Sequence, residues 1–356
     1  MRIVTMVCIY TNTQYKVSSK CSTPQENTSP IMADNFTAAE MQRFDSKLQG
    51  KYIPLAFAGA GTCGEVFMAI PKKNSLKNGK LTTKTADIRR QICAVKIAVH
   101  PERSEYITPH PSFAREIAVL KQLTENKTKS SVRLPELIDC MSTGQAETSE
   151  PTWFCMTAVP GFQMMRLEDI AQDICQPLPQ ALVAHAYLQL QKAVDFLHTR
   201  KVPITKGDMQ SLNVMVDAAR LESTGFPDFV LIDFGSSTVG ATAKDCDAEW
   251  MWFCVMLNNF ATCGKMGLPE LADAQSDKDW DYFVTATGEV WLDCCDLDSA
   301  GWVKFLDRLT SIAEKAKKNT SEEARECIHR KVSACNNLWN KMLSDKQILD
   351  ALRNDS

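Results

Sequence analysis

The chain carries KGDMQSLN at residues 206–213 and VLIDFG at residues 230–235, with the apolar segment VMV directly after the first of them. The order is an aspartate, then an asparagine, a short strand candidate, a turn, and a second strand candidate that ends in Asp-Phe-Gly. Oxygens such as those of Asn213 and Asp233 are ligands that Mg²⁺ prefers, and Asp208 can orient an attacking hydroxyl. Three unrelated loop residues would rarely show this order and spacing, so we predict a metal-binding catalytic site.

A glycine-rich stretch, GAGTCG at residues 59–64, lies upstream and precedes a strand candidate at Val66 to Ile70. Glycines at this spacing let a tight turn approach phosphate oxygens, because no Cβ blocks the backbone N–H groups. Taken alone, the stretch is more simply an ordinary hairpin turn. A dinucleotide-binding turn would be followed by a helix instead of a strand, so that class of site is not expected.

A single lysine, Lys96, interrupts the apolar strand candidate Cys93-Ala94-Val95-Lys96-Ile97. Standing alone, it would be read as an edge lysine whose ammonium reaches solvent. Glu116 follows on a helix predicted for residues 112–124, with Ser112 as its candidate N-cap. An ordinary exposed helix glutamate is the simpler interpretation, but a carboxylate there could also hold Lys96 in place for phosphate contact.

Taken together and in this order, these segments resemble a protein-kinase-like domain over about residues 52–260. The resemblance implies an α+β fold of two lobes, an N-lobe with an antiparallel sheet and one helix and a C-lobe that is mainly helical. It also implies that the protein binds ATP and Mg²⁺ and transfers the γ-phosphate to a hydroxyl acceptor.

The resemblance also implies roles for individual residues. Asp208 would be the catalytic base, and Lys96, paired with Glu116, would contact the α- and β-phosphates. Asn213 and Asp233 would be the metal ligands. The residues implied in nucleotide binding are Gly59, Gly61, Gly64, Val66, Ala94, Lys96 and Met215, with residues 157–160 as the hinge.

Strand candidates come first and helices afterwards, which favours a two-part α+β architecture. We expect a flexible leader and a short helix in residues 1–50, the N-lobe in 51–159 and the C-lobe with C-terminal helices in 160–356. A basic insert at residues 71–91 is read as a solvated hairpin extension, with a substrate or partner patch as the alternative. The other expected elements are strands at 52–57, 92–99, 136–141, 153–159, 214–216 and 229–232, and helices at 37–50, 180–199, 247–260 and, three in number, within 299–352.

Three features depart from the family pattern. Lys206-Gly207 replaces the usual His-Arg before the catalytic aspartate, and Gln210 replaces a lysine that helps to neutralise the transferred phosphoryl group. After Gly235 the chain reaches a predicted buried helix, apolar on all sides, without room for a peptide-docking segment. In this respect the chain is similar to aminoglycoside and choline phosphotransferases. Asp245 or Asp247 would then cap this helix and brace the catalytic loop, although a plain N-cap explains either residue equally well.

The sequence therefore leaves three hypotheses for function. The first is a kinase acting on a protein Ser or Thr hydroxyl. The second is a small-molecule kinase for an amino alcohol or an aminoglycoside-like acceptor. The third is a catalytically weak pseudokinase that acts as a binding module, which is disfavoured because all five polar residues of the family pattern are retained.

Composition adds limits on class and location. The formal net charge of −3 gives no electrostatic reason to expect a nucleic-acid or membrane partner. Fourteen cysteines at irregular spacing, without a Cys-x-x-Cys pair, favour a reducing, cytoplasmic setting over a disulfide framework. The apolar run Ile3 to Tyr10 is followed by polar residues, so we expect no secretory signal. The oligomeric state is not indicated by the sequence.

Overall fold

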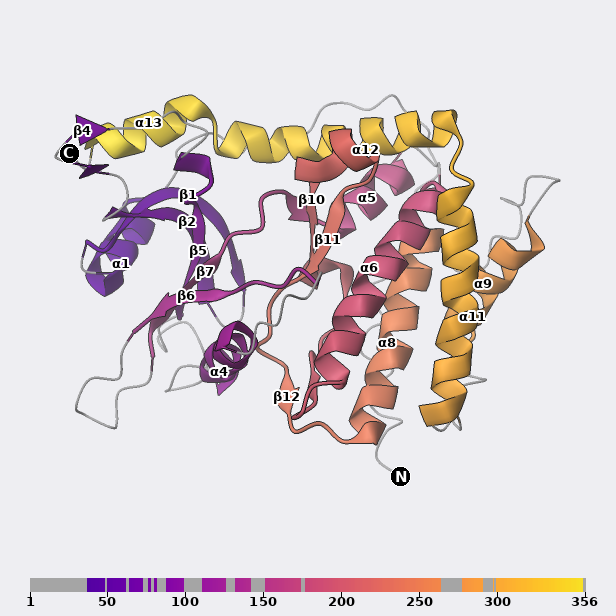
Figure 1. Cartoon of the computed structure of the whole chain (residues 1–356). Coiled ribbons are helices and arrows are strands. Elements are labelled where there is room, and N and C mark those ends of the chain that lie inside the picture. Colours follow the sequence, from indigo (N-terminus) through magenta and orange to yellow (C-terminus); the bar gives the residue numbers. More distant parts are fainter. Residues whose placement is uncertain are drawn as a thin grey trace, which may run out of the picture. The chain divides into compact units, whose positions relative to one another are not determined.

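An antiparallel sheet of five strands forms the first half of the computed structural model (Figure 1). Its strands lie in the order β1 (Tyr52–Gly61), β2 (Gly64–Pro71), β5 (Cys93–Ala98), β7 (Trp153–Thr157) and β6 (Leu137–Cys140). Each neighbouring pair is antiparallel, with Val66 opposite Lys96 and Lys96 opposite Phe154. We call residues 37–157 the sheet half and residues 160–354 the helical half.

The structure describes residues 37–48, 50–61, 64–72, 76–77, 80–81, 88–98, 111–125, 132–141, 151–173, 177–263, 277–290, 297 and 299–354. All of them belong to one unit, Asn35–Ser356, and the second unit, Met1–Asp34, lies outside the described residues. The apolar run near the N-terminus and the predicted leader therefore also lie outside them.

Side chains that alternate along the strands cover both faces of the sheet. On one face, Phe67 packs edge-on against Phe44 of helix α1 (Ala38–Leu48), with ring centroids 5.2 Å apart. On the other face, Phe154 packs against Phe113 of helix α4 (Pro111–Glu125), with centroids 5.1 Å apart. The sheet is thus buried on both sides, which explains why its strands are nearly continuous apolar runs.

The helical half is built around α6 (Gln180–His198) and α8 (Ala243–Thr262). Tyr187 of α6 is fully buried, and its hydroxyl donates to Leu306 O of α11 at 3.0 Å. This satisfied hydroxyl lets a large polar ring join α6 to α11 in the core. The other helices are α5 (Met165–Asp173), α9 (Lys278–Gly288), α11 (Ser299–Lys318), α12 (Glu322–Met342) and α13 (Asp345–Asn354).

Two short sheets lie in the helical half, near the sheet half. The hairpin of β10 (Val214–Asp217) and β11 (Asp228–Leu231) pairs with β8 (Phe162–Gln163). Its turn contains the 3₁₀ helix η3 (Ala218–Arg220) and the short helix α7 (Leu221–Thr224). The second sheet pairs β9 (Ile204–Thr205) with β12 (Thr238–Val239).

The last two helices contact both halves (Figure 1). Helix α12 packs against α5 and β8, and α13 packs against β1. Arg89, from the predicted basic insert, donates to Leu343 O at 2.6 Å and forms an ion pair with Asp345 at 2.8 Å. These contacts place part of the insert against the C-terminal helices.

Most of the predicted elements are present, often longer than expected. The insert contains a hairpin, β3 (Leu76–Lys77) with β4 (Lys80–Leu81), although the side chains of its strands lie outside the description. The three C-terminal helices are confirmed. Trp302, Leu306 and Leu309 are buried in the core.

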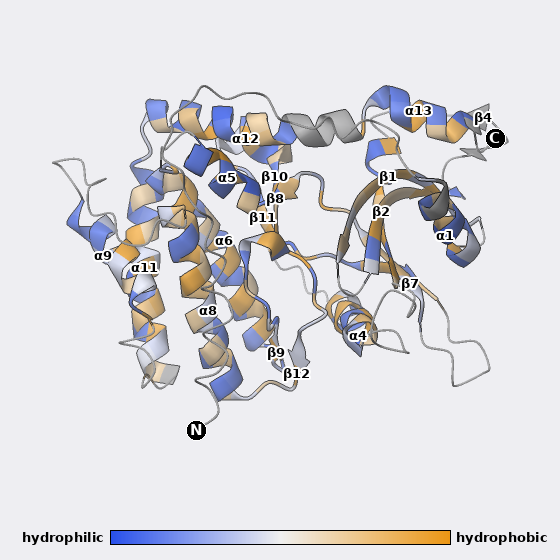
Figure 2. Cartoon of the chain, turned by 180° about the vertical axis from the view of Figure 1, so that it is seen from behind, coloured by the Kyte–Doolittle hydropathy of each residue, from blue (hydrophilic) through white to orange (hydrophobic). Residues whose placement is uncertain are grey.

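Two expectations were wrong. Helix α4 begins at Pro111, so Ser112 lies within its first turn, buried, and is not the N-cap. Proline suits that first position because it has no N–H to satisfy and its φ is already helical. Helix α8 is not buried on all sides, because the Trp252 side chain is 46% exposed. Figure 2 shows hydrophilic and hydrophobic residues interleaved along the long helices, and none of the described helices is long and apolar enough to cross a membrane.

Candidate active site

Lys96 joins three distant segments of the chain. Its Nζ donates to Glu116 Oε2 at 2.6 Å and to Asp233 Oδ1 at 3.5 Å. β5 is the middle strand of the sheet and Lys96 is only 5% exposed, so it is not an edge lysine that reaches solvent. A buried ammonium is tolerated here because two carboxylates share its charge.

Glu116 is fully buried on α4 and links Lys96 to the Asp-Phe-Gly turn. Its Oε1 accepts a hydrogen bond from Phe234 N–H at 3.3 Å. Burial raises the pKa of this carboxyl, whereas the Lys96 ammonium lowers it. The ionised form of Glu116 therefore depends on Lys96, and the interpretation as an exposed helix glutamate is wrong.

Asp233 occupies a backbone conformation that side-chain-bearing residues rarely adopt, with φ of +59°. The turn is fixed by its neighbours. Gly235 N–H donates to Asp233 Oδ1 at 3.2 Å, Arg115 donates to Gly235 O at 3.1 Å, and the Phe234 ring is fully buried. A conformation of this kind persists only where the surroundings enforce it, and such positions cluster at functional sites. Here it leaves the Asp233 carboxylate 46% exposed beside Lys96.

The loop before β10 gathers the other predicted residues. Asp208 Oδ2 accepts hydrogen bonds from Asn213 Nδ2 and Gln210 Nε2, both at 2.8 Å. Asn213 Nδ2 also donates to Asp208 O at 3.1 Å. Because the amide nitrogen of Asn213 is committed to Asp208, its Oδ1 is the atom that can ligate a cation.

Lys206 is fully buried next to this loop, and its Nζ donates to Asp208 O at 2.8 Å. Burial lowers its pKa, and the charges of surrounding carboxylates oppose that effect. These carboxylates are Asp233, Asp208, Glu249 and Glu116. Lys206 therefore offsets the repulsion among acidic groups that the fold brings together. We interpret its role as structural.

Glu249 on α8 braces the loop and was missed by the sequence analysis. Its Oε1 accepts from Gly207 N–H at 2.8 Å and its Oε2 contacts His198 Nε2 at 2.7 Å. The expectation that Asp245 braces the loop was wrong, because its carboxylate instead forms a capping box with Thr242 at the start of α8. A glutamate within the apolar run of α8 was the signal that could have revealed the brace, since a buried carboxylate needs partners.

Gly207 explains one departure from the expected motif. Its φ is +79°, and a Cβ at this position would lie 2.2 Å from Ser236 O. Only glycine fits such a close approach of two backbone segments at positive φ. The loop and the segment after Gly235 are therefore packed directly on each other, without an intervening side chain.

The predicted glycine turn is partly described. Gly61 pairs with Gly64 at the end of the β1–β2 hairpin, and residues 62–63 between them lie outside the description. A Cβ on Gly64 would lie 2.6 Å from Ile97 O and 3.3 Å from Lys96 Cγ, so a side chain here would collide with the paired strand β5. Gly59 has a φ of +153°, a backbone conformation that residues with a side chain rarely adopt, so glycine is favoured at this position.

The residues predicted to enclose a base lie on two sheets. Val66 is opposite Lys96 in the β2–β5 register, and Ala94 is buried on β5. Met215 is half-buried on β10, where it pairs with Gln163 of β8. Their joint contact with a base stays a prediction, as does the role of residues 157–160 as a hinge.

Glu168 of α5 is a second acidic group that the sequence analysis did not identify. It accepts a hydrogen bond from the Ser211 hydroxyl of the loop that holds Asp208. Burial raises its pKa to about 7. The unfolded chain releases this proton near pH 4.5 and the folded chain keeps it to about pH 7, so ionisation of Glu168 costs stability as pH rises between these values.

We therefore expect Glu168→Gln to become increasingly more stable than the wild type between pH 4.5 and about pH 7. Thermal denaturation over this pH series measures the difference in Tm, which should be small at the acid end and level off near neutrality. Glu125→Gln, at an exposed glutamate of α4 that pairs with Lys121, is the control and should show no such trend. A difference independent of pH would show that Glu168 titrates normally.

The donor set fits a hard cation with few protein ligands. Among the described residues, no group of three or more His, Cys, Asp or Glu side chains could hold a metal ion. Asn213 and Asp233 instead supply one amide and one carboxylate oxygen, a small set that suits Mg²⁺ with water and phosphate oxygens as the remaining ligands. No protein-family model matches the chain, and comparison with curated proteins found no matching relative.

Proposed function

We propose that this protein is an ATP- and Mg²⁺-dependent phosphotransferase with a two-lobed, protein-kinase-like fold. The observation that carries the proposal is the buried Lys96 ammonium between Glu116 and Asp233, at 2.6 Å and 3.5 Å. A lysine fixed in this way by two carboxylates suits contact with phosphate oxygens. The Asp-Phe-Gly turn that carries Asp233 is also hydrogen-bonded to Glu116 of α4, through Phe234 N–H. The sheet half and the helical half therefore both shape the site.

Each side chain has a distinct task in the proposal. Lys96 holds the α- and β-phosphates, Glu116 positions Lys96, and the N–H groups around Gly61 and Gly64 face the phosphates. Asn213 Oδ1 and Asp233 would hold the magnesium ion, which supplies positive charge that neutralises the phosphate oxygens.

Asp208 is the proposed base. Its Oδ2 accepts from Asn213 and Gln210, which fixes the carboxylate orientation. The acceptor hydroxyl gives its proton to Asp208, its oxygen forms a bond to the γ-phosphorus, and the bond from that phosphorus to the bridging oxygen breaks. ADP leaves with the electron pair, so charge and atoms balance.

The segment after the Asp-Phe-Gly turn favours a small-molecule acceptor over a folded protein. Residues 236–242 alone separate Gly235 from α8, and Thr238–Val239 pair directly with Ile204–Thr205 beside the loop. A chain this short, already paired with β9, supports no separate docking surface for a peptide. A small acceptor such as an amino alcohol or an aminoglycoside needs no such surface. Transfer to protein Ser or Thr is the second candidate.

We expect ATP with Mg²⁺ to stabilise the protein and ATP without a divalent cation to stabilise it much less. At a ligand concentration of about 100 times Kd, binding to the folded state contributes about 2.7 kcal/mol, which shifts Tm by several degrees. Thermal denaturation of the full chain measures this shift, with AMP as the control for the base and ribose. Absence of a shift with any combination of nucleotide and metal would rule out nucleotide binding.

The acceptor is identified by a separate assay of ADP release. Amino alcohols, aminoglycosides and sugars are tested one class at a time, with generic protein substrates and the chain itself in a parallel arm. ADP release that depends on a small acceptor supports the first candidate. Phosphate incorporation into protein alone supports the second. Nucleotide binding without transfer to any acceptor would favour the binding-module hypothesis.

A further inference from the structure

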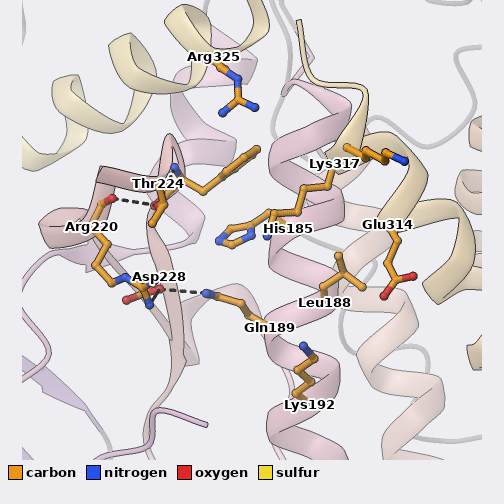
Figure 3. A pocket seen from close by; sticks show the side chains of 12 residues that line it. His185, Leu188, Gln189, Lys192, Arg220, Thr224, Asp228, Glu314, Lys317 and Arg325 are labelled. Atoms are coloured by element: carbon orange, nitrogen blue, oxygen red, sulfur yellow. Dashed lines mark hydrogen bonds and ion pairs between the residues drawn. The ribbon is translucent and has the colours of Figure 1, made fainter. Parts of the chain in front are cut away.

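A cavity of about 580 Å³ lies between α6, the turn of the β10–β11 hairpin, and the helices α11 and α12 (Figure 3). It is distinct from the candidate active site. Asn213 precedes β10 and Asp233 follows β11, whereas the cavity is at the turn end of the same hairpin. Four residues of strand separate the two ends, which is about 13 Å.

The cavity is strongly basic. Five cationic side chains and two carboxylates line it, and the cations come from three separate parts of the chain. They are Lys192 of α6, Arg220 of the hairpin turn, Lys317 and Lys318 of α11, and Arg325 of α12. The chain as a whole is slightly acidic, with a net charge of −3, so this concentration of positive charge is local. Figure 3 shows the Arg220, Lys192, Lys317 and Arg325 side chains around the same space.

Among the described residues, the two carboxylates of the cavity pair with only one of these cations, Arg220. Asp228 is buried, and it is engaged by Arg133 at 2.8 Å, by Arg220 at 3.6 Å and by a hydrogen bond from Gln189 at 2.9 Å. Glu314 is exposed on α11. Among the described residues, no carboxylate lies within ion-pair distance of Lys192, Lys317, Lys318 or Arg325. The positive charge of these four side chains is therefore not offset by ion pairs in the described part of the chain.

Lys317 and Arg325 are instead held over an aromatic ring. Their cationic groups lie 5.3 Å and 5.8 Å from the centre of the Phe226 ring, which is buried. The pKa of Lys317 is lowered by partial burial and, in addition, by the charges of Lys192 and Arg220. Repulsion among cations held this close together destabilises the free protein, and a bound anion would relieve that repulsion.

His185 adds an unsatisfied polar group to the cavity wall. The residue is only 6% exposed, and its Nε2 lies 2.9 Å from Pro227 O. A carbonyl can only accept, so Nε2 carries the proton and Nδ1 is an acceptor. Nδ1 is buried and has no hydrogen-bond partner among the described residues. In Figure 3 the ring extends from α6 toward the hairpin turn on the opposite wall.

We propose that this cavity is a binding site for a small soluble polyanion, a polyol or sugar that carries two or more phosphate groups. The phosphates would lie among Lys192, Arg220, Lys317 and Arg325, where each cation forms charge-assisted hydrogen bonds. A turn of the His185 ring would bring its Nδ1, buried in the free protein, to a hydroxyl of the same ligand. The volume of about 580 Å³ is within the range of small-molecule sites.

Isothermal titration calorimetry on the full chain with fructose bisphosphate tests the proposal. We expect saturable binding of one equivalent that weakens as salt increases, and binding at least about tenfold weaker in Lys317→Gln/Arg325→Gln. Lys315→Gln is the matched control, because Lys315 lies on the same helix but pairs with Asp279 at 2.5 Å. It should bind as the wild type does.

Two further measurements separate this cavity from the candidate active site and from a membrane-binding surface. Lys96→Met/Glu116→Leu removes the phosphate-facing lysine of the candidate active site and should leave binding of the probe within about twofold of the wild type. Vesicles that contain phosphatidylinositol bisphosphate should not be preferred over the soluble probe. The proposal is overturned if the wild type binds no probe, if Lys315→Gln weakens binding equally, if the Lys96 variant abolishes it, or if only vesicles bind.

Discussion

Replacing Lys96 with methionine will abolish phosphoryl transfer and lower the stability of the fold at the same time. The side chain is 7% exposed and its partner Glu116 is 1% exposed, so the substitution leaves a buried carboxylate without its counter-ion. Breaking a buried ion pair in this way costs about 3–5 kcal/mol. Thermal or urea denaturation measures the stability, and ADP release measures the transfer.

The double variant Lys96→Met/Glu116→Leu separates the two effects. Two apolar side chains of similar volume in place of the pair are often neutral or stabilising, so the double variant should recover most of the stability that the single variant loses. It should not recover activity, because no cation faces the phosphates. Recovery of both stability and activity would show that Lys96 is a structural residue and would remove the main support for the proposed function.

Asp208→Asn will reduce the transfer rate about 10²- to 10⁴-fold, the usual contribution of a general base, while the affinity for nucleotide changes little. Asparagine retains an oxygen that can accept from Asn213 and Gln210, which now share Oδ2 of the aspartate. The loop should therefore keep its conformation, and the loss should appear in kcat. Steady-state kinetics with varied ATP and the nucleotide-dependent Tm shift measure the two quantities.

Asp169→Asn serves as the matched control for this variant. Asp169 lies on the neighbouring helix α5, where its side chain is 42% exposed and pairs with Arg166. A kcat for Asp208→Asn within about threefold of the wild type would show that Asp208 is not the base. A large rise in KM with unchanged kcat would instead assign it to binding.

The carboxylates around the loop account for the Lys206-Gly207 sequence. Lys206 places a cation among four acidic groups, and Gly207 allows the loop to approach Ser236 while its N–H donates to Glu249. Gln210 is hydrogen-bonded to Asp208, so it orients the carboxylate and does not supply a cation. Because glutamine at position 210 carries no positive charge, the metal ion has to neutralise more of the phosphate charge in the proposed reaction.

The α+β class, the order of most strands and helices, and the polar residues worth testing could all be predicted from the amino-acid sequence. This was possible because Lys96 interrupts an apolar strand, Asp233 follows one and Asp208 lies in the loop that leads into one, and polar residues in such places are detectable from neighbouring residues alone. The tertiary structure decided which of these groups meet. Lys96, Glu116 and Asp233 lie on separate elements, and their convergence depends on how the sheet half and the helical half pack.

Two features were missed by the sequence analysis. Glu249 gave too weak a signal in a helix that was predicted to be wholly apolar. The basic cavity gave no signal, because its cations come from α6, a hairpin turn and α11–α12. Charges so far apart in sequence become one site only when the helices between them are packed together.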